Sequence, residues 1–495
     1  MDLGDAHSQL INDGVVRPGG SEHAQAVALS GSFVQSSGGT TYSEIDFRDN
    51  AADAILATGS VALAGTVDVR LVNTAAIPVG TFSKILFRGD GGVVNNGATW
   101  RTAPSAVVTY APSYAPTTAA LKYTVDFSPA GLDSNLSAVG KYINGVQLHG
   151  GGSSQYGELV TKLVGDPDMS TYRASLSQLS PEFYGSHQVE LLNSGIDFGQ
   201  ALLSCRQAGG DHRFLREGSC VWMQYDSYER NADAQNDFKP IDGKTTRFSL
   251  GMQKTRDNDW SFGFGVSRED DDSAGYADQW SSAGRTYHVG FAAKRRYGAT
   301  KWSNVLTYGW SDMNSVRNGS LLGSFRTTMN RDIDLLAGAT RLAHDFEINS
   351  WYVRPMIDGG VAKLMAHRAA EEGAGAASLV LPGYDETYIW VRPGIEIGKE
   401  FSLRAGSTLR VYGNVGAQEY LSRSRTEVQA LLAGAPPGVD PMSVGIAIGD
   451  HQTRSALGVE LFAKNNFVAQ FRLQSGIYDS NKIDSATLRF ELPLR

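Results

Sequence analysis

A regular alternation of apolar and polar side chains marks the C-terminal half of the chain, most clearly in residues 260–268, WSFGFGVSR. Trp260, Phe262 and Phe264 occupy alternate positions, with serine or glycine between them. Because successive side chains of a β-strand face opposite sides, we predict a strand with one apolar and one polar face. The pattern returns from about residue 219 to the C-terminus. A soluble sandwich, or a membrane barrel with an apolar outer face, can produce it.

We predict about twelve strands in this region, an even number within the range of outer-membrane barrels. Their centres are VWMQY, TRFSLGMQ, WSFGFGV, RTYHVGFAA, WSNVLTYGW, RDIDLLAGATRL, WYVRPMIDGG, YIWVRPGIEI, TLRVYGNV, RSALGVELF, FVAQFRL and ATLRFELPL.

The connections between these strands alternate in length. Long ones are predicted at 230–243, 270–284, 311–330, 363–386 and 419–451, and short ones at 255–259, 295–300, 345–350, 399–406 and 463–466. Outer-membrane barrels have short periplasmic turns on one rim and long extracellular loops on the other. A soluble sandwich has no reason to keep this alternation, so the connections favour the barrel.

The polar face of the last strands carries charges of both signs. Arg454 and Glu460 alternate with Leu457 and Val459, and Arg489 lies in a similar pattern. Such charges are costly in lipid or in a dry core but acceptable in a water-filled lumen. Tryptophans near predicted strand ends are expected to form the interfacial girdles of a barrel. They are Trp260, Trp302, Trp310, Trp351 and Trp390.

The N-terminal part, to about residue 130, shows short strands separated by glycine-rich turns. Predicted strands lie within 57–73, 84–94, 106–114 and 119–127. Short strands with such turns are typical of a β-helix or of a β-sandwich, and the pattern does not distinguish the two.

Between residues 131 and 205 the apolar period becomes helical. Helices are predicted at 135–147, 156–164, 170–179 and 182–205. The last begins at Ser180-Pro181-Glu182, a capping side chain, a proline for the first turn and an acid at the positive end of the helix dipole. It contains Gly185, Gly195 and Gly199, which cost helix stability. They indicate either a loosely packed surface helix or a slim helix in a narrow space.

Composition narrows the class of protein. The 495 residues include 56 Gly, 20 Tyr and 20 Phe, as in a β-rich protein, and the net charge of -8 argues against a nucleic-acid partner. No apolar run of about 18 residues occurs, so no transmembrane helix is expected. The N-terminus lacks a basic stretch followed by an apolar one, so an exported chain is expected to be a fragment or a truncated gene product. Cys205 and Cys220 favour an oxidising compartment over a metal site.

Several segments resemble one family, the pertactin-like autotransporters of type V secretion. GSVALAGTVDVRLVN (59–73) and KILFRGDGG (84–92) resemble the end of a β-helical passenger, its autochaperone region. SLSQLSPEFYGS (175–186) is similar to the linker of the family, with Leu179, Ser180, Glu182 and Tyr184 at the matching places. CVWMQYDSY (220–228) resembles the first barrel strand, and EEGAGAASLVLPG (371–383) resembles a loop that precedes an apolar strand.

The resemblance implies an all-β protein whose C-terminal, twelve-stranded antiparallel barrel spans the membrane at 219–495. A short β-helix and autochaperone segment at 1–130 precede a helical linker at 131–205, whose 182–204 helix threads the lumen.

The implied function is an outer-membrane translocation unit of a Gram-negative bacterium that displays its own N-terminal passenger, of adhesin or virulence type, at the cell surface. Outer-membrane lipid, the barrel-assembly machinery, periplasmic chaperones and a host-cell surface are the implied partners. Members of the family usually end in an aromatic residue that the assembly machinery reads. This chain ends in Arg495, and Phe490 is its nearest aromatic.

No enzyme motif is present: there is no GxSxG elbow and no HExxH, and the nine histidines do not cluster with acids at metal-ligand spacing. We therefore predict no catalytic residue, metal or cofactor. The alternative function is a porin-like channel with a periplasmic N-terminal domain.

Three smaller features have two readings each. Arg88-Gly89-Asp90 is either an integrin-type receptor tripeptide or simply a turn. Asn193-Ser194 is either a cleavage point, as in family members that cut themselves within the pore, or part of a helix interior, which we favour because the double Asn of that group is absent. Cys205 and Cys220 either form a disulfide that pins the linker helix to the periplasmic rim or remain two reduced thiols.

Overall fold

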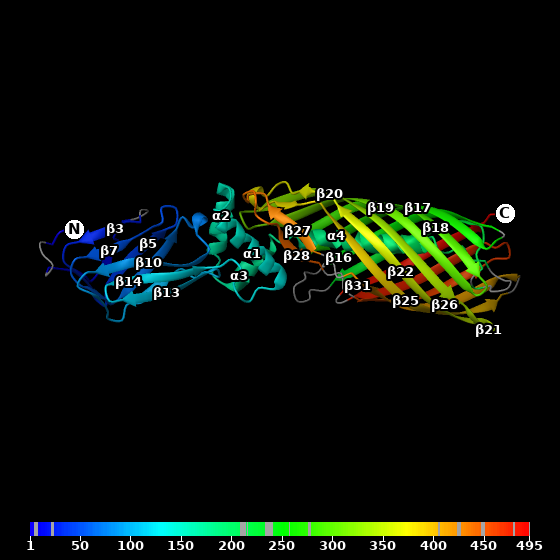
Figure 1. The fold of residues 1–495 in the computed structure, drawn as a ribbon, viewed down its shortest axis with the longest axis horizontal. Coiled ribbons are helices and arrows are strands. Elements are labelled where there is room, and N and C mark those ends of the chain that lie inside the picture. The colour runs from blue at the N-terminus through cyan, green and yellow to red at the C-terminus, as the bar shows by residue number, and fades with distance from the viewer. Residues whose placement is uncertain are drawn as a thin grey trace.

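The structure is a computed structural model that describes residues 1–3, 8–20, 24–207, 214, 216–232, 241–256, 258–275, 279–403, 406–422, 427–446, 451–478 and 481–494. Figure 1 shows an elongated molecule with a narrow N-terminal β-domain at one end and a barrel at the other. Four α-helices lie between or inside them. The C-terminal Arg495, the subject of one sequence prediction, lies outside the described residues.

The N-terminal β-domain is a β-helix, which resolves the ambiguity with a sandwich. Successive coils stack their strands in parallel into three ladders. The ladders are β1 (Gln9–Asn12), β4 (Ser32–Gln35), β8 (Val61–Leu63) and β11 (Val93–Asn95); β3 (Ala26–Leu29), β7 (Ala54–Ala57) and β10 (Gly80–Gly89); and β2 (Val15–Val16), β5 (Thr40–Asp46), β9 (Thr66–Val72) and β12 (Thr99–Thr102). A two-residue strand, β6 (Ala51–Ala52), pairs with β5.

The alternating residues of 57–73 supply the interior of the β-helix. Val61, Leu63, Val67 and Val69 are all buried. The last coil ends differently, because β10 pairs with β14 (Thr118–Val125) and β14 with β13 (Val108–Ala115), both antiparallel. This hairpin closes the C-terminal end of the β-helix.

Three short helices follow the β-helix: α1 (Ser134–Leu148), α2 (Ser154–Val164) and α3 (Met169–Ser177). Each begins at a capping side chain that accepts a backbone N–H of the first turn. The pairs are Asp133 with Leu136, Ser153 with Tyr156 and Asp168 with Thr171. The hydrogen bonds hold the pKa of Asp168 below its usual value, so this cap stays ionised at neutral pH. Among the described residues, no helix has both the length and the apolar character needed to cross a membrane.

Twelve long strands in the described part of the chain form the barrel, as the sequence predicts. They are β15 (Cys220–Ala232), β16 (Ile241–Thr255), β17 (Trp260–Gly275), β18 (Trp280–Tyr297), β19 (Thr300–Gly319), β20 (Phe325–His344), β22 (Trp351–Ala366), β25 (Tyr384–Ser402), β26 (Thr408–Tyr420), β29 (His451–Phe462), β30 (Val468–Tyr478) and β31 (Asn481–Pro493). Each pairs antiparallel with the next. The barrel closes where β15 pairs with β31 from Cys220↔Pro493 to Ala232↔Asn481. Closure leaves no open sheet edge in the membrane.

The two faces of the strands point as the alternation predicts. Phe264 is 51% exposed on the outer wall, whereas Ser261 is 3% exposed inside. One girdle prediction is wrong: Trp390 is 2% exposed and packs inside the lumen. Its alternate position on β25 puts it on the inner face, next to apolar residues of the helix that fills the pore.

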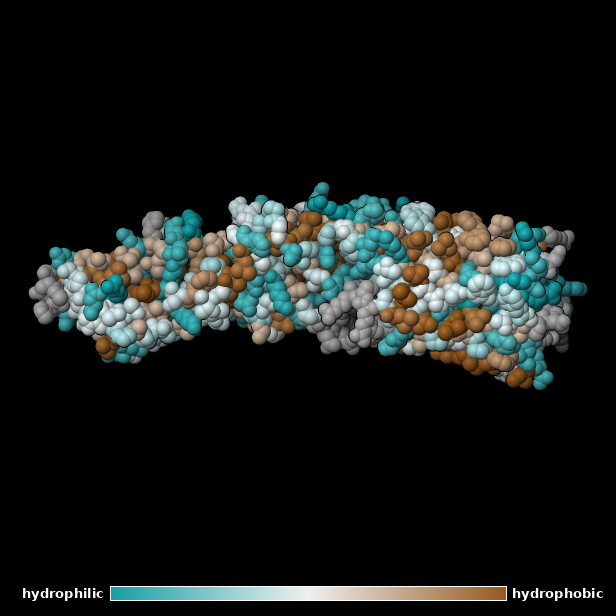
Figure 2. All heavy atoms as spheres, viewed as in Figure 1, coloured by the Kyte–Doolittle hydropathy of each residue, from teal (hydrophilic) through white to brown (hydrophobic). Residues whose placement is uncertain are grey.

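The strands run further than their apolar segments, which corrects the predicted lengths of two long connections. Most of 270–284 and 311–330 is strand, because β17, β18, β19 and β20 continue beyond the apolar region. Their outer face there is charged: Arg268, Asp270 and Arg285 form exposed ion pairs. Figure 2 shows hydrophobic residues gathered on the part of the barrel away from the helices, and more hydrophilic residues on the part next to the helices. Backbone pairing therefore continues where the apolar signal stops.

Two of the remaining long connections, 363–386 and 419–451, build a small sheet on one rim of the barrel. The middle of the third, residues 233–240, lies outside the described residues. The sheet contains β23 (Ala369–Ala370), β24 (Leu379–Leu381), β27 (Glu427–Leu432) and β28 (Met442–Gly445). We call the rim that carries this sheet the long-loop rim. The opposite rim, the short-turn rim, carries the tight turns and the small strand β21 (Phe346–Ile348), which pairs with β22.

Candidate functional site: a helix-filled pore

The fourth helix, α4 (Glu182–Ala201), runs through the barrel lumen. At its start, the ring of Phe183 lies 5.3 Å from that of Trp280 at the long-loop rim. Past its end, Cys205 reaches Cys220, the first residue of β15 at the short-turn rim. Along its length α4 contacts β18, β19, β20 and β22. The chain that precedes α4 therefore leaves the barrel at the long-loop rim.

The glycines of α4 lie where the wall comes closest. A Cβ at Gly195 would run into the side chain of Leu335, and one at Gly199 would lie 3.3 Å from Val305. A Cβ at Gly185 would meet Ile446 on the long-loop side. Of the two sequence interpretations, the slim helix in a narrow space is confirmed. These glycines lower the stability of the helix itself, but they allow it to fit closely against the wall of the pore.

One face of α4 packs against an apolar part of the wall. Leu191, Leu192 and Ile196 meet a cluster of buried residues on β20, β22 and β25: Ile333, Leu335, Ala337, Ala362, Leu364, Ala366, Tyr388 and Trp390. This contact holds the helix to one side of the lumen.

The other face of α4 is polar and is held by ion pairs and hydrogen bonds. Glu190 pairs with Arg230, and Asp197 pairs with Arg454. The hydroxyl of Ser194 donates to Glu269 at 2.6 Å, and its oxygen lies 3.0 Å from Nε2 of His288. Ion pairs thus hold the polar face of the helix to the opposite side of the barrel wall, at β15 and β29.

The termini of α4 differ from the prediction. Pro181 is the capping residue and offers no side-chain bond, although Ser180 Oγ accepts the N–H of Glu182 at 3.4 Å. The helix ends at Ala201, before the predicted 204. Arg489 explains this end, because its guanidinium donates to the carbonyl oxygens of Ala201, at 2.9 Å, and of Ser204. Those bonds take up carbonyls that a longer helix would use internally.

Asn193 and Ser194 lie inside α4, as the favoured helix-interior reading expects. The side chain of Asn193 accepts a hydrogen bond from Arg454 at 3.2 Å. Cleavage at this point stays untested.

The described residues of the segment after α4 lie in the mouth of the barrel at the short-turn rim. We call this segment the rim segment; it spans 202–219, of which 202–207, 214 and 216–219 are described. Arg206 Nη1 lies 3.0 Å from Glu460 Oε1, and Glu217 lies 2.9 Å from Lys294 and 2.7 Å from Lys301. Its charges therefore meet partners on opposite parts of the wall.

An aromatic contact and the cysteines complete the rim segment. The ring of Phe214 lies 4.4 Å from that of Tyr352. The structure pairs Cys205 with Cys220, with Cα atoms 6.1 Å apart. The sequence patterns do not single out Arg206, Phe214 and Glu217, which lie between the two cysteines. The one available signal was that a disulfide would hold this segment at the rim.

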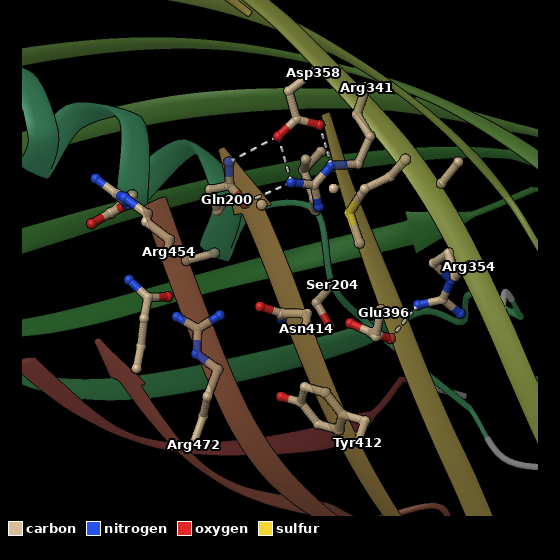
Figure 3. A pocket seen from close by; sticks show the side chains of 18 of the residues that line it. Gln200, Ser204, Arg341, Arg354, Asp358, Glu396, Tyr412, Asn414, Arg454 and Arg472 are labelled. Carbon is tan, nitrogen blue, oxygen red and sulfur yellow. Dashed lines mark hydrogen bonds and ion pairs between the residues drawn. The ribbon is translucent and has the colours of Figure 1, made fainter. Parts of the chain in front are cut away.

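Between α4, the rim segment and the wall lies a polar cavity of about 140 Å³. Figure 3 shows its side chains pointing inward from several strands, with Asp358 bridging Arg341 and Gln200. The wall is hollow here in part because Gly394 and Gly416, which face each other on β25 and β26, have no side chains. Arginine–carboxylate pairs dominate this level of the lumen, as in a water-filled barrel rather than a dry core.

The predicted receptor tripeptide lies far from the pore, at the end of strand β10. Gly89 is buried, and the Arg88 guanidinium lies 3.0 Å from the Asp90 carboxylate. The two side chains thus neutralise each other. A receptor role for Arg88-Gly89-Asp90 stays a prediction.

Comparison with known proteins identifies the family to which the barrel is similar. Residues 221–474 match the family described as "Autotransporter beta-domain". A comparison with curated protein sequences gives no match.

Several solved structures are similar in fold. The translocator domain of autotransporter NalP from Neisseria meningitidis is 10% identical, with a TM-score of 0.48 over 63% of this chain and 97% of that one. The beta domain of the Bordetella autotransporter Brka is 15% identical, with a TM-score of 0.41 over 56% and 100%. The transport unit of AIDA-I from Escherichia coli is 12% identical, with a TM-score of 0.39 over 56% and 90%. Because the family match covers just over half of the chain, from β15 into β30, this protein belongs to the autotransporter beta-domain family and carries its outer-membrane translocation unit.

Proposed function

We propose that the barrel exports the N-terminal region and displays it at the cell surface. The observation that carries this proposal is the course of α4, from Phe183 at the long-loop rim to Cys205 at the short-turn rim. In outer-membrane barrels the short turns face the periplasm and the long loops face outward. The β-helix, which leaves at the long-loop rim, is then outside the cell.

The contacts beyond the pore support the same direction. Tyr142 of α1 accepts the N–H of Leu432 on β27 at 2.9 Å, and Asn135 and Gly445 exchange two hydrogen bonds. One continuous apolar core runs from the β-helix through α1–α3 into the loop sheet. Folding of the exported segment onto the outer loops buries apolar surface, which favours onward movement and opposes return.

The porin alternative fits the lumen less well. A general porin needs an open aqueous channel. In this barrel α4 and the described residues of the rim segment run through the lumen from one rim to the other. A cavity of about 140 Å³ remains beside the helix.

Protease accessibility on intact cells tests the proposal. The chain is expressed behind a signal peptide with an N-terminal epitope, and protease is added outside. We expect loss of the epitope and survival of a barrel fragment that begins near residue 200. An epitope protected until the outer membrane is broken would contradict surface display and favour a periplasmic N-terminal region.

We further propose an adhesin-type or virulence role for the displayed segment, with a host-cell surface as partner. Bacteria that display the whole chain are compared with bacteria that display only the barrel with α4, and adhesion to cultured host cells is counted. Arg88→Ala and Asp90→Ala, tested separately, isolate the tripeptide. Equal adhesion by the two strains would contradict an adhesin role for the displayed N-terminal segment.

Insertion by the barrel-assembly machinery, with periplasmic chaperones, completes the proposal. The aromatic residue near the C-terminus that supports recognition by this machinery is Phe490. It lies on the outer face of β31 with the exposed Leu488 and Leu492, and its ring stacks on that of Phe467 at 6.1 Å. Replacement by Ala should slow appearance of the folded, heat-modifiable form, and Leu488→Ala is the matched control.

A further inference from the structure

Among the described residues that line the polar cavity beside α4, one cationic side chain lacks a carboxylate partner. Eight described cationic side chains line the cavity: Arg206, Lys301, Arg341, Arg354, Arg392, Arg454, Arg472 and Arg489. Seven of them have carboxylate partners. The pairs are Arg206 with Glu460, Lys301 with Glu217, Arg341 and Arg392 with Asp358, Arg354 with Glu396, Arg454 with Asp197, and Arg489 with Glu491. Arg472 has neither a hydrogen bond nor an ion pair within the described chain. Its Nε is buried and unsatisfied.

Arg472 also points into the cavity. Figure 3 shows its guanidinium directed inward from β30, toward Asn414 on β26. The strand between them, β29, presents Ala456 and Gly458 at the paired positions, Ala456 opposite Asn414 and Gly458 opposite Arg472. The ring of Tyr412 on β26 occupies the space over Gly458, and Arg472 and Asn414 line the cavity beside this ring. A buried N–H group without a partner is costly, and an acceptor bound in the cavity would remove that cost at Nε of Arg472.

Neutral donors lie close to the same space. The side-chain amides of Asn414 and Gln474 line the cavity, and each carries two N–H groups. The C-terminal carbonyls of α4, which would repel an anion, are already occupied by Arg489. Asp197, Asp358 and Glu396 also line the cavity, but each is paired with an arginine, so Arg472 is the described cation left to attract an anion.

We propose that this cavity is a binding site for one small oxyanion of the phosphate or sulfate type. A guanidinium presents several donors in a fixed fork that matches an oxyanion, and amides from a second strand can supply further donors to other oxygens. A spherical halide cannot meet separated donors in this way. The volume of about 140 Å³ admits such an ion together with water. The site does not depend on the direction of export.

The test uses inorganic phosphate and the full chain folded in detergent micelles, with chloride as background salt. Equilibrium dialysis with radiolabelled phosphate should show saturable binding of one ion per chain. Phosphate should also raise the thermal unfolding midpoint more than chloride at equal ionic strength, because a ligand that binds only the folded state stabilises it. Arg472→Gln should weaken the affinity by about tenfold or more, since it removes a charge-assisted bond. Arg368→Gln, which removes an exposed arginine after β22, should leave it unchanged.

Three results would overturn the proposal: no saturable phosphate binding to the native chain, equal stabilisation by chloride, or full affinity in Arg472→Gln. If Arg472→Gln does not reach the heat-modifiable folded form, Asn414→Ala takes its place. That variant should weaken binding while leaving the ion pairs of the wall intact, and unchanged affinity in it would count against the site.

Discussion

Two buried tyrosines in the helical region differ in one respect, the fate of their hydroxyl groups. Tyr172 donates to the carbonyl of Phe127 at 2.5 Å, whereas the hydroxyl of Tyr156 has no partner in the described structure. Burial raises the pKa of both tyrosines. Both rings belong to the continuous core.

We therefore expect opposite effects from the same substitution. Tyr156→Phe should leave the stability of the N-terminal half unchanged or raise it by up to about 1 kcal/mol, because it removes an unsatisfied buried group. Tyr172→Phe should lower stability by about 1–2 kcal/mol, because the carbonyl of Phe127 loses its donor. Urea unfolding followed by limited proteolysis measures both. Equal losses for the two variants would contradict the assignment.

The charge alternation of the strands was readable from sequence because each residue reports its own face. Arg454, Glu460 and Arg489 were predicted to face the lumen, and all three are buried there. Their partners were not predictable. Arg454 pairs with Asp197 of α4, and the two are far apart in the chain. Trp390 was misplaced for a related reason, since a tryptophan suits an interfacial girdle and a packed helix equally well.

At the scale of elements, periodicity predicted type and number well and pairing poorly. Local alternation located the twelve barrel strands, but it could not distinguish a β-helix from a sandwich. That difference lies in which strands pair, and β5 pairs with β9 across more than twenty residues. The ends of the strands were also predicted wrongly, because β19 and β20 stay paired through backbone hydrogen bonds beyond the apolar region, toward the long-loop rim.

The glycines of α4 give a prediction at this scale. Gly195→Ala should hinder barrel assembly or destabilise the folded barrel, because the new methyl group meets Leu335 in a wall that cannot move far. Gly145→Ala in α1 is the matched control, since its methyl group would have only Val439 at 3.8 Å nearby. The control should be neutral or stabilise its helix by up to about 1 kcal/mol. The heat-modifiable fraction on gels measures assembly, and an equal fraction in both variants would refute the narrow fit.

The rim segment is the second element that fills the pore, and we propose that its disulfide keeps it in place. The Cys205–Cys220 bond closes a loop of sequence separation 15. A loop of that size corresponds to about 3 kcal/mol of stabilisation. Cys205→Ser with Cys220→Ser should leave α4 in the lumen but loosen the mouth. We expect more frequent open events in planar bilayers, with the native protein under reducing conditions as the comparison.

Mass spectrometry of outer-membrane material gives the independent check. Both thiols free in the native protein would remove the disulfide from the account. Arg206 and Glu217 would then hold the rim segment through their ion pairs alone.

At the scale of the whole molecule, the barrel and the N-terminal region are joined by more than a linker. Tyr184 near the start of α4 donates to Glu371 at 2.5 Å, and Arg317 of β19 pairs with the same carboxylate. Glu371 belongs to the loop segment 371–383 that the sequence singled out. The loop sheet at the long-loop rim shares one apolar core with α1–α3, so it forms part of the surface on which these helices pack.

The contact between α1 and β28 makes this dependence measurable. Asn135 accepts the N–H of Gly445 at 2.9 Å and donates to its carbonyl at 3.2 Å. Asn135→Leu should leave both groups of Gly445 without these bonds and cost about 1–3 kcal/mol at the junction. On intact cells the helices and β-helix should become more sensitive to external protease, while the barrel keeps its heat-modifiable form. Lys141→Ala, on the exposed face of the same helix, should change neither. If Asn135→Leu leaves protease resistance unchanged, the N-terminal region holds its fold without this contact to the long-loop rim.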